Sequence, residues 1–176
     1  TNIQFLQPKT AIPAISSIIT NQKVIEVCTS ILRGGQMVVD NAVLFYAGKG
    51  NIYKQGWHRD VLQVPDEEID SNWFSPTYFH NNVQVNIPLV EDKCLWVVAG
   101  SHHRRTMTDD EQRIFAGSKK MAPIELTEEL PNGQQVLVKP GEAIFYNNNL
   151  IHRGFAPVLN TDRITLQLGF HSNAFY

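Results

Sequence analysis

Near the start of the chain, apolar residues recur with the period of a helix. Between Val24 and Leu32 they occupy positions i, i+1, i+4, i+7 and i+8, which lie on one helical face. The pair Gly34-Gly35 follows, and glycine at this position favours the left-handed conformation that ends helices. Residues 1–36 are therefore predicted to form a helical flank.

From residue 37 onward the pattern changes to that of short strands. Apolar residues from Val83 to Ile87 alternate with Gln84 and Asn86, which gives one apolar and one polar strand face. Turn dipeptides such as Pro140-Gly141 separate the segments. Many short strands joined by turns are typical of a sandwich or barrel, so we expect an all-β core over residues 37–170. The predicted strands are Met37–Tyr46, Val83–Val90, Leu95–Ala99, Gln135–Val138, Ala143–Tyr146 and Arg163–Phe170.

Composition and charge narrow the class of protein. The chain has 176 residues, of which 43% are hydrophobic and 18% charged, with a formal net charge of -2. This length suits a single domain, which we expect to span residues 1–176. A net charge so close to zero excludes a dedicated nucleic-acid-binding protein, because phosphate neutralisation requires an excess of Lys and Arg. The apolar runs are too short to cross a bilayer, so no membrane partner is expected.

The cysteines point to a reducing compartment. Cys28 and Cys94 are too few for a disulfide framework and too far apart in sequence for a CxxC metal motif. We interpret both as buried thiols, which predicts a cytoplasmic location. The chain begins at Thr1 rather than at methionine, so this prediction takes nothing from the lack of a signal peptide.

Two long connections interrupt the predicted strands. Val61–Asn82 and Arg104–Asn132 are longer than most loops of compact domains, and such loops are usually functional. For the second, a surface insertion is an equally good interpretation. Within it, Thr108 and Glu111 have the spacing of a capping box, which predicts a short helix ending near Gly117. The first carries four aromatic residues that form either a substrate wall or packing against the sheet: Trp73, Phe74, Tyr78 and Phe79.

Candidate chemistry lies in the histidines, because the common nucleotide and nucleophile motifs are absent. His58 and Asp60 are two residues apart in a segment expected to be extended, so their side chains point to one side and Arg59 to the other. One further imidazole would complete a set of two histidines and one carboxylate, which favours non-heme Fe(II). Alone, the pair is equally consistent with a surface ion pair.

A second group of candidate residues lies near the end of the chain. His152 precedes Arg163 by eleven residues across a strand connection. An arginine on a strand that returns past a metal site is suited to hold a dicarboxylate that chelates the metal, because guanidinium offers two parallel hydrogen bonds. Thr165, on the same strand face, would add a hydroxyl. A strand-end salt bridge is the alternative role for Arg163.

In this order and spacing the motifs resemble the phytanoyl-CoA dioxygenase family, within the Fe(II)/2-oxoglutarate-dependent dioxygenases. The resemblance extends from about Met37 to Phe170, and Ala99 stands where the family usually has proline. Family chains usually begin with a longer helical portion, so the resemblance implies that an N-terminal part is missing here. The segments that carry it are Gly56–Asp60, Cys94–His102, Pro140–Phe145, Leu150–Gly154 and Arg163.

The resemblance implies both a fold and a site. The fold is a double-stranded β-helix, a jelly-roll or cupin-like pair of facing antiparallel sheets with helices at its flanks and iron at one mouth. The iron ligands are His58, Asp60 and His152, and Arg163 binds the far carboxylate of 2-oxoglutarate. The implied reaction uses O2 to hydroxylate a small-molecule C–H bond and releases succinate and CO2. A carboxylate at Asp60 argues against halogenation, for which this position is left open.

Other residues and functions stay open. The polar face of Gln84 and Asn86 would line the cavity and touch the cosubstrate. His102 begins a basic cluster that either holds an anionic substrate or packs a turn, whereas His80 and His171 are interpreted as structural and Trp57 and Trp96 as core residues. The alternatives to an oxygenase are a non-catalytic binding or sensing module and a cupin-like metal-dependent isomerase or hydrolase. The cluster comprises His102, His103, Arg104 and Arg105.

Overall fold

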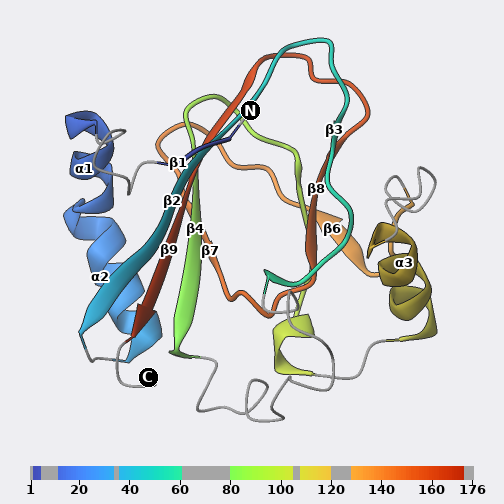
Figure 1. Ribbon diagram of the computed structural model, residues 1–176, viewed down its shortest axis with the longest axis horizontal. Coiled ribbons are helices and arrows are strands. Elements are labelled where there is room, and N and C mark those ends of the chain that lie inside the picture. The colour runs from blue at the N-terminus through green and yellow to red at the C-terminus, as the bar shows by residue number, and fades with distance from the viewer. Residues whose placement is uncertain are drawn as a thin grey trace.

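Two antiparallel sheets face each other in the computed structural model, which describes residues 2–4, 12–33, 36–60, 80–104, 108–119 and 128–172 (Figure 1). The predicted double-stranded β-helix is therefore confirmed. The larger sheet has the strand order β1 (Asn2–Gln4), β2 (Met37–Ala47), β9 (Arg163–Ser172), β4 (Asn82–Pro88) and β7 (Ile144–Tyr146). The smaller sheet has the order β3 (Tyr53–Lys54), β8 (His152–Ala156), β5 (Leu95–Val98) and β6 (Gly133–Gln135).

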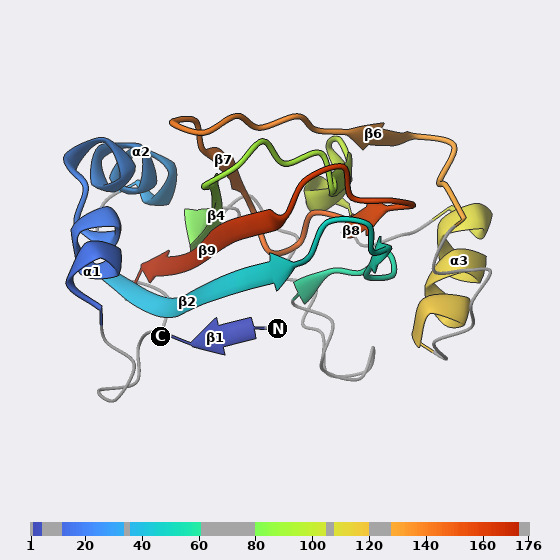
Figure 2. The same cartoon turned by 90° about the horizontal axis from the view of Figure 1, so that it is seen from above.

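Two helices, α1 (Pro13–Ile19) and α2 (Gln22–Leu32), lie on the outer side of the larger sheet (Figure 2). The Asn21 side chain begins α2 by accepting backbone hydrogen bonds from the next turn, and Arg33 ends it at a φ of 53°. The predicted cap at Gly34-Gly35 lies outside the described residues. None of the described helices is long and apolar enough to cross a membrane.

The strands of the larger sheet separate an apolar core from a polar interior. On β9, Leu166 and Leu168 are completely buried and belong to the cluster beneath α2. Thr165 and Gln167 alternate with them and therefore face the space between the sheets. The same alternation on β4 sends Val83 and Val85 to the core, together with Cys28 of α2. On these two strands the apolar side chains thus face α2, and the polar ones face the space between the sheets.

The outer side of the smaller sheet has its own core. Trp57 is 1% exposed and packs with Ile114 of α3 (Asp109–Lys119), with partly buried Trp96 against the cluster. The predicted capping box forms: the Thr108 N–H donates to Glu111 Oε2 at 2.8 Å, and the Glu111 N–H donates to Thr108 Oγ1 at 3.3 Å. Both cysteines are free and buried, as predicted.

Several elements differ from those predicted. β1 lies in the predicted helical flank and pairs with β2, while β3 and β8 were not predicted. The strand expected at Gln135–Val138 is shifted, because β6 ends at Gln135 and Val138 makes only an isolated bridge with Asp92. The aromatic residues proposed as a substrate wall lie outside the described residues.

Replacing Leu168 with alanine tests the core beneath α2. The side chain is completely buried, so its loss removes apolar contacts and leaves a cavity. We expect the free energy of unfolding in urea to fall by about 2–5 kcal/mol. Val158→Ala is the matched control, since this valine is 59% exposed and should cost less than about 0.5 kcal/mol. Equal losses in the two variants would contradict this assignment of the core.

Candidate metal centre

The structure brings together the three residues predicted as metal ligands. His58 and His152 face each other across an antiparallel bridge, in which each N–H donates to the other's carbonyl, at 2.9 and 3.0 Å. The Asp60 N–H donates to the carbonyl of Asn148 at 3.1 Å. One ligand atom from each of His58, Asp60 and His152 lies within 4.8 Å of the other two. This donor set suits a divalent transition metal.

Backbone carbonyls fix the orientation of both imidazoles. His58 Nδ1 lies 2.7 Å from the carbonyl of Gly56, and His152 Nδ1 lies 2.9 Å from that of Leu150. A carbonyl only accepts hydrogen bonds, so each Nδ1 carries the proton and each Nε2 is directed to Asp60, at 3.3 and 3.5 Å from its carboxylate oxygens. Ligating histidines characteristically use the second ring nitrogen in this way.

Burial and mutual charge shift the pKa values of all three groups. Burial raises the pKa of Asp60, but the hydrogen bond from His58 and the charge of His152 outweigh it and hold the value at about 2. Burial and the neighbouring His58 lower the pKa of His152 to about 4. Burial also lowers the pKa of His58, yet Asp60 outweighs it and leaves the value above the ordinary one. Of the three groups, His58 therefore keeps a proton to the highest pH.

A series of hydrogen bonds between amide side chains and the Tyr146 hydroxyl connects the Asp60 carboxylate with the interior of the molecule. Gln84 donates through Nε2 to Asp60 Oδ2, and its Oε1 accepts from Gln167 Nε2 at 3.2 Å. Gln167 also donates to Tyr146 Oη at 3.1 Å, and the Tyr146 hydroxyl donates to Asn86 Oδ1 at 3.5 Å. Gln84 thus contacts a candidate ligand directly, which fixes the direction in which that carboxylate points.

One cavity between the sheets contains both the candidate ligands and Arg163. His58, Asp60 and His152 line it together with Arg163 and Asn86. The Arg163 side chain is buried, and its Nη1 has no hydrogen-bond partner in the described part of the structure. A buried donor without a partner is costly, so this atom is suited to an anionic ligand that enters the cavity.

Asp92 and Tyr53 hold the Arg163 guanidinium in place. Arg163 Nε donates to Asp92 Oδ2 at 2.9 Å, and the Thr165 hydroxyl donates to the same oxygen. The guanidinium carbon lies 4.3 Å from the centre of the Tyr53 ring. Gly154 leaves room for this ring, because a Cβ there would come within 2.5 Å of Tyr53 Cε1. Burial raises the pKa of Asp92, but the charge of Arg163 outweighs it and holds the value below the ordinary one.

The other arginines near the motif have different contacts. Arg59 donates to the carbonyl of Ser101 at 3.2 Å. Arg153 is completely buried and lies over the rings of Trp57, Trp96 and Phe155, with its guanidinium carbon 4.6–5.0 Å from their centres. These contacts hold both side chains within the fold, and Arg153 also lines the cavity that contains the candidate ligands and Arg163.

Four residues of the site escaped the sequence analysis: Tyr53, Asp92, Tyr146 and Gln167. Gln167 had a visible signal, because it interrupts the apolar residues of β9 as Gln84 and Asn86 interrupt those of β4. Tyr53 and Asp92 lie in a two-residue strand and an isolated bridge, where the sequence has no periodic pattern.

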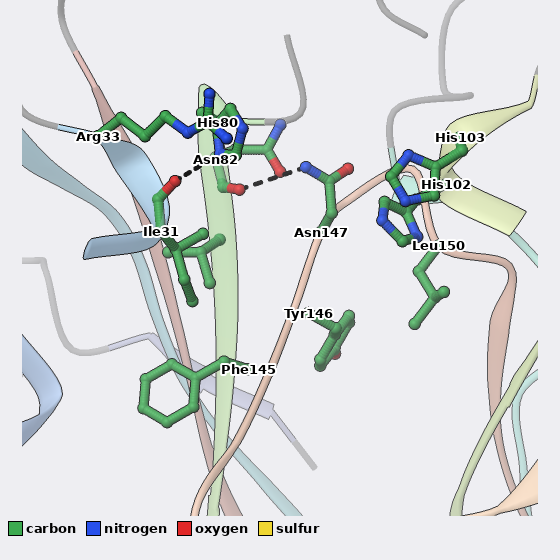
Figure 3. A pocket seen from close by; sticks show the side chains of 11 residues that line it. Ile31, Arg33, His80, Asn82, His102, His103, Phe145, Tyr146, Asn147 and Leu150 are labelled. Carbon is green, nitrogen blue, oxygen red and sulfur yellow. Dashed lines mark hydrogen bonds between the residues drawn. The ribbon is translucent and has the colours of Figure 1, made fainter. Parts of the chain in front are cut away.

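A second pocket, of about 580 Å³, adjoins the metal centre (Figure 3). Tyr146 lines both this pocket and the cavity of Arg163, and its ring centre lies 5.2 Å from that of His152. His80, which lies just before β4, and His102, which follows the end of β5, line the pocket as well. The His80 Nδ1 lies 2.7 Å from the carbonyl of Ile31, a contact that suits the predicted structural role. The His80 ring is also part of the pocket wall.

Comparison with known proteins supports an oxygenase fold. The sequence model of the phytanoyl-CoA dioxygenase (PhyH) family matches residues 4–161. No curated protein sequence matches the chain significantly.

Several solved structures share the fold of this chain at 14–18% sequence identity. HygX from Streptomyces hygroscopicus with iron bound has 14% identity and a TM-score of 0.72, over 98% of this chain and 72% of HygX. A further HygX structure contains nickel and 2-oxoglutarate. AviO1 from Streptomyces viridochromogenes Tue57 has 17% identity and a TM-score of 0.66, over 98% of this chain and 67% of AviO1. EvdMO1 has 18% identity and a TM-score of 0.65, and the chain spans only 35% of its length.

Metal affinity should depend on pH through His58. A metal ion must displace the proton that His58 keeps because of its raised pKa. We expect the affinity for Co(II), measured by titration between about pH 5 and 8, to be constant above this pKa and to fall about tenfold per pH unit below it. His171→Gln should leave the profile unchanged, since His171 pairs with Asp40 outside the site. An affinity that rises as the pH falls would contradict the ligand assignment.

Proposed function

The chain belongs to the phytanoyl-CoA dioxygenase family, and from this premise we propose that it is an Fe(II)- and 2-oxoglutarate-dependent oxygenase that hydroxylates a C–H bond of a small molecule. One observation carries the proposal: the cavity that contains the three candidate ligands also contains the buried, unpartnered Nη1 of Arg163. A metal site and a carboxylate-binding group in one cavity fit a cosubstrate that is both a chelator and a dicarboxylate.

In this proposal, His58, Asp60 and His152 would hold the iron, and the rest of the cavity would receive the cosubstrate. Iron supplies the activation of O2, with succinate and CO2 as the products of the cosubstrate. Gln84 keeps Asp60 Oδ2 engaged, so that Asp60 Oδ1 is the oxygen available to the metal.

Arg163 binds the distal carboxylate of 2-oxoglutarate in this proposal, and Asp92 positions it. Asp92 engages Nε and leaves the opposite side of the guanidinium for the ligand. Thr165 acts through Asp92, because its hydroxyl donates to the same carboxylate oxygen. Its predicted direct contact with the cosubstrate, and those of Gln84 and Asn86, stay predictions. Of these three, Asn86 lines the cavity.

Turnover of 2-oxoglutarate tests the proposed function. The chain is incubated with Fe(II), ascorbate and 2-oxoglutarate in air, and succinate is measured. We expect succinate from the wild type and at least a 100-fold loss in His152→Ala, because even changes outside the first ligand shell cost roughly 10–100-fold. His171→Gln is the matched control. Metal binding without any succinate would favour the isomerase or hydrolase alternative, and no metal binding would favour a non-catalytic module.

The Arg163→Lys variant tests the carboxylate clamp. Lysine keeps the charge but loses the planar fork, and charge-assisted hydrogen bonds contribute roughly 1.5–3 kcal/mol each. We expect 2-oxoglutarate to bind about 10–100-fold more weakly, measured without oxygen by the visible charge-transfer band of the Fe(II) complex. Pyruvate lacks the distal carboxylate, so its binding should be unchanged. An equal loss for both ligands would assign the effect to the metal centre instead.

The Asp92→Asn variant separates positioning from direct binding. The change removes the charge that holds Arg163 Nε, while the guanidinium remains. We expect weaker 2-oxoglutarate binding, unchanged pyruvate binding and unchanged Fe(II) affinity. In a double-mutant cycle with Arg163→Lys the two effects should not add, because Asp92 acts through Arg163. Additive losses would contradict this role.

A further inference from the structure

The backbone bridge that carries the two candidate imidazoles also has an outer face. His58 and His152 line the cavity, so the side chains next to them in sequence are directed to the outer side of the smaller sheet. In an antiparallel pair, the residue before one bridge partner lies beside the residue after the other. Trp57 and Arg153 are therefore neighbours on the outer face, directly behind the two histidines.

Trp57 and Arg153 share one hydrogen-bond acceptor. The indole N–H of Trp57 donates to the backbone carbonyl of Glu128 at 3.0 Å, and Arg153 Nη1 donates to the same oxygen at 2.7 Å. The guanidinium carbon of Arg153 also lies 4.7 Å from the centre of the Trp57 ring. Both side chains are fully buried, which strengthens hydrogen bonds of this kind. Trp57, Arg153 and the Glu128 carbonyl, here called the outer clasp, thus join the two segments that carry the histidines.

The acceptor of the outer clasp is itself fixed on two sides. Glu128 belongs to no helix or strand, but its carboxylate accepts from both terminal nitrogens of Arg113 in α3, at 2.7 and 2.9 Å. Leu130, two residues later, is buried in the same core as Trp57, and its carbonyl accepts from the N–H of Gly133 at the beginning of β6. The Glu128 carbonyl is therefore connected with α3 and with β6, which lie near each other in Figure 1.

The charge of Arg153 points to a role beyond packing. Its guanidinium is surrounded by the rings of Trp57, Trp96 and Phe155, with distances of 4.6–5.0 Å to their centres. Burial lowers the pKa of Arg153 to about 10, which leaves the group protonated at neutral pH. A buried cation is costly, and an apolar side chain of similar volume often packs equally well or better. An apolar side chain, however, would not bond to the carbonyl of Glu128.

The bridge between the histidines needs support, because it is isolated. His58 and His152 form a single bridged pair outside the named strands, and the neighbouring strand pair β3 and β8 has only two residues in register. The two Nε2 atoms lie 3.3 and 3.5 Å from the carboxylate oxygens of Asp60. A rotation of one segment against the other would change the separation of the imidazoles. The outer clasp opposes such a rotation, since it joins the same two segments from behind.

We propose that Trp57 and Arg153 are positioning residues for the metal centre, and that the outer clasp holds the two imidazoles at the spacing at which both bind one metal ion. The proposal rests on the metal centre that the proposed function uses, but not on the reaction at that centre. Neither residue provides a ligand in it. Each acts through the backbone of the histidine beside it, and the Glu128 carbonyl connects both with α3.

Two indole groups allow a matched test of the outer clasp. Trp57→Phe removes the N–H that donates to Glu128 and keeps an aromatic ring. Trp96→Phe is the control, because it removes an N–H that donates to the carbonyl of Phe155 at 3.1 Å, from a ring that also contacts Arg153. We expect Trp57→Phe to bind Co(II) about three- to tenfold more weakly than the wild type, as for the loss of one buried hydrogen bond, and Trp96→Phe to bind it unchanged.

Urea unfolding of the metal-free variants separates stability from metal affinity. Both substitutions alter the core of the outer side, so a purely structural role would lower stability and leave Co(II) binding to the folded chains unchanged. The visible absorption of bound Co(II), which depends on the arrangement of its ligands, should change in Trp57→Phe and not in Trp96→Phe. An unchanged affinity in Trp57→Phe, or equal losses in the two variants, would overturn the proposal.

Arg153→Lys tests the second donor and remains informative if Trp57→Phe fails to fold. Lysine keeps the positive charge near the metal but loses the planar group that lies over the rings. We expect Co(II) to bind about three- to tenfold more weakly here too. In a double-mutant cycle with Trp57→Phe the losses should not add, because both donors act through one carbonyl. Full additivity would overturn the shared role of Glu128.

This proposal and the proposed function fail in different ways. A wild-type chain that binds no Co(II) would reject the metal centre and the outer clasp together. Equal Co(II) affinities of the wild type, Trp57→Phe and Arg153→Lys would reject the outer clasp and retain the metal centre. The expected losses of affinity in a chain that forms no succinate would retain the outer clasp and reject the oxygenase.

Discussion

The geometry of the metal centre depends on a pair of backbone hydrogen bonds between His58 and His152. These bonds join the segment that carries the first two candidate ligands to β8, which carries the third. Both imidazoles then project from one bridged pair of residues, and the carbonyls two residues before each histidine hold their Nδ1 atoms. Ligand spacing is thus set by the backbone, and the side chains have little freedom left to lose when a metal binds.

Side chains along β4 and β9 alternate between the two faces of the larger sheet, so one face packs against α2 and the other lines the interior. Leu166 and Leu168 pack beneath α2, while Thr165 and Gln167, which alternate with them along the strand, face the interior. A shift of one residue in either strand would exchange the two faces and bury the polar set under the helix. The apolar packing of α2 therefore also fixes which residues of β4 and β9 face the cavity, although no residue of α2 lines that cavity.

The sequence predicted those parts of the structure in which a local pattern repeats. The face of α2, the alternation on β4 and the capping box of Thr108 and Glu111 were each visible within a few residues. β8 was not predicted, because its sequence serves three other needs: a ligand at His152, an aromatic cage for Arg153, and space for Tyr53 at Gly154. The strands β1 and β3 are two or three residues long and are defined by their partners.

The difference between local sequence patterns and contacts between distant residues also explains which site residues the sequence analysis predicted. His58 and Asp60 form a local motif, and the order of His152 and Arg163 is specific to a family. Asp92 belongs to no motif, because its role depends on a contact with a residue 71 positions away in the chain.

The contact between Asp92 and Arg163 changes how Arg163 can recognise an anion. The buried arginine and aspartate form a nearly neutral pair, so attraction of an anion over a distance is weak. Recognition of a carboxylate in this cavity then depends on the direction in which the free side of the guanidinium points, and Asp92, with Tyr53 stacked against the same group, determines that direction.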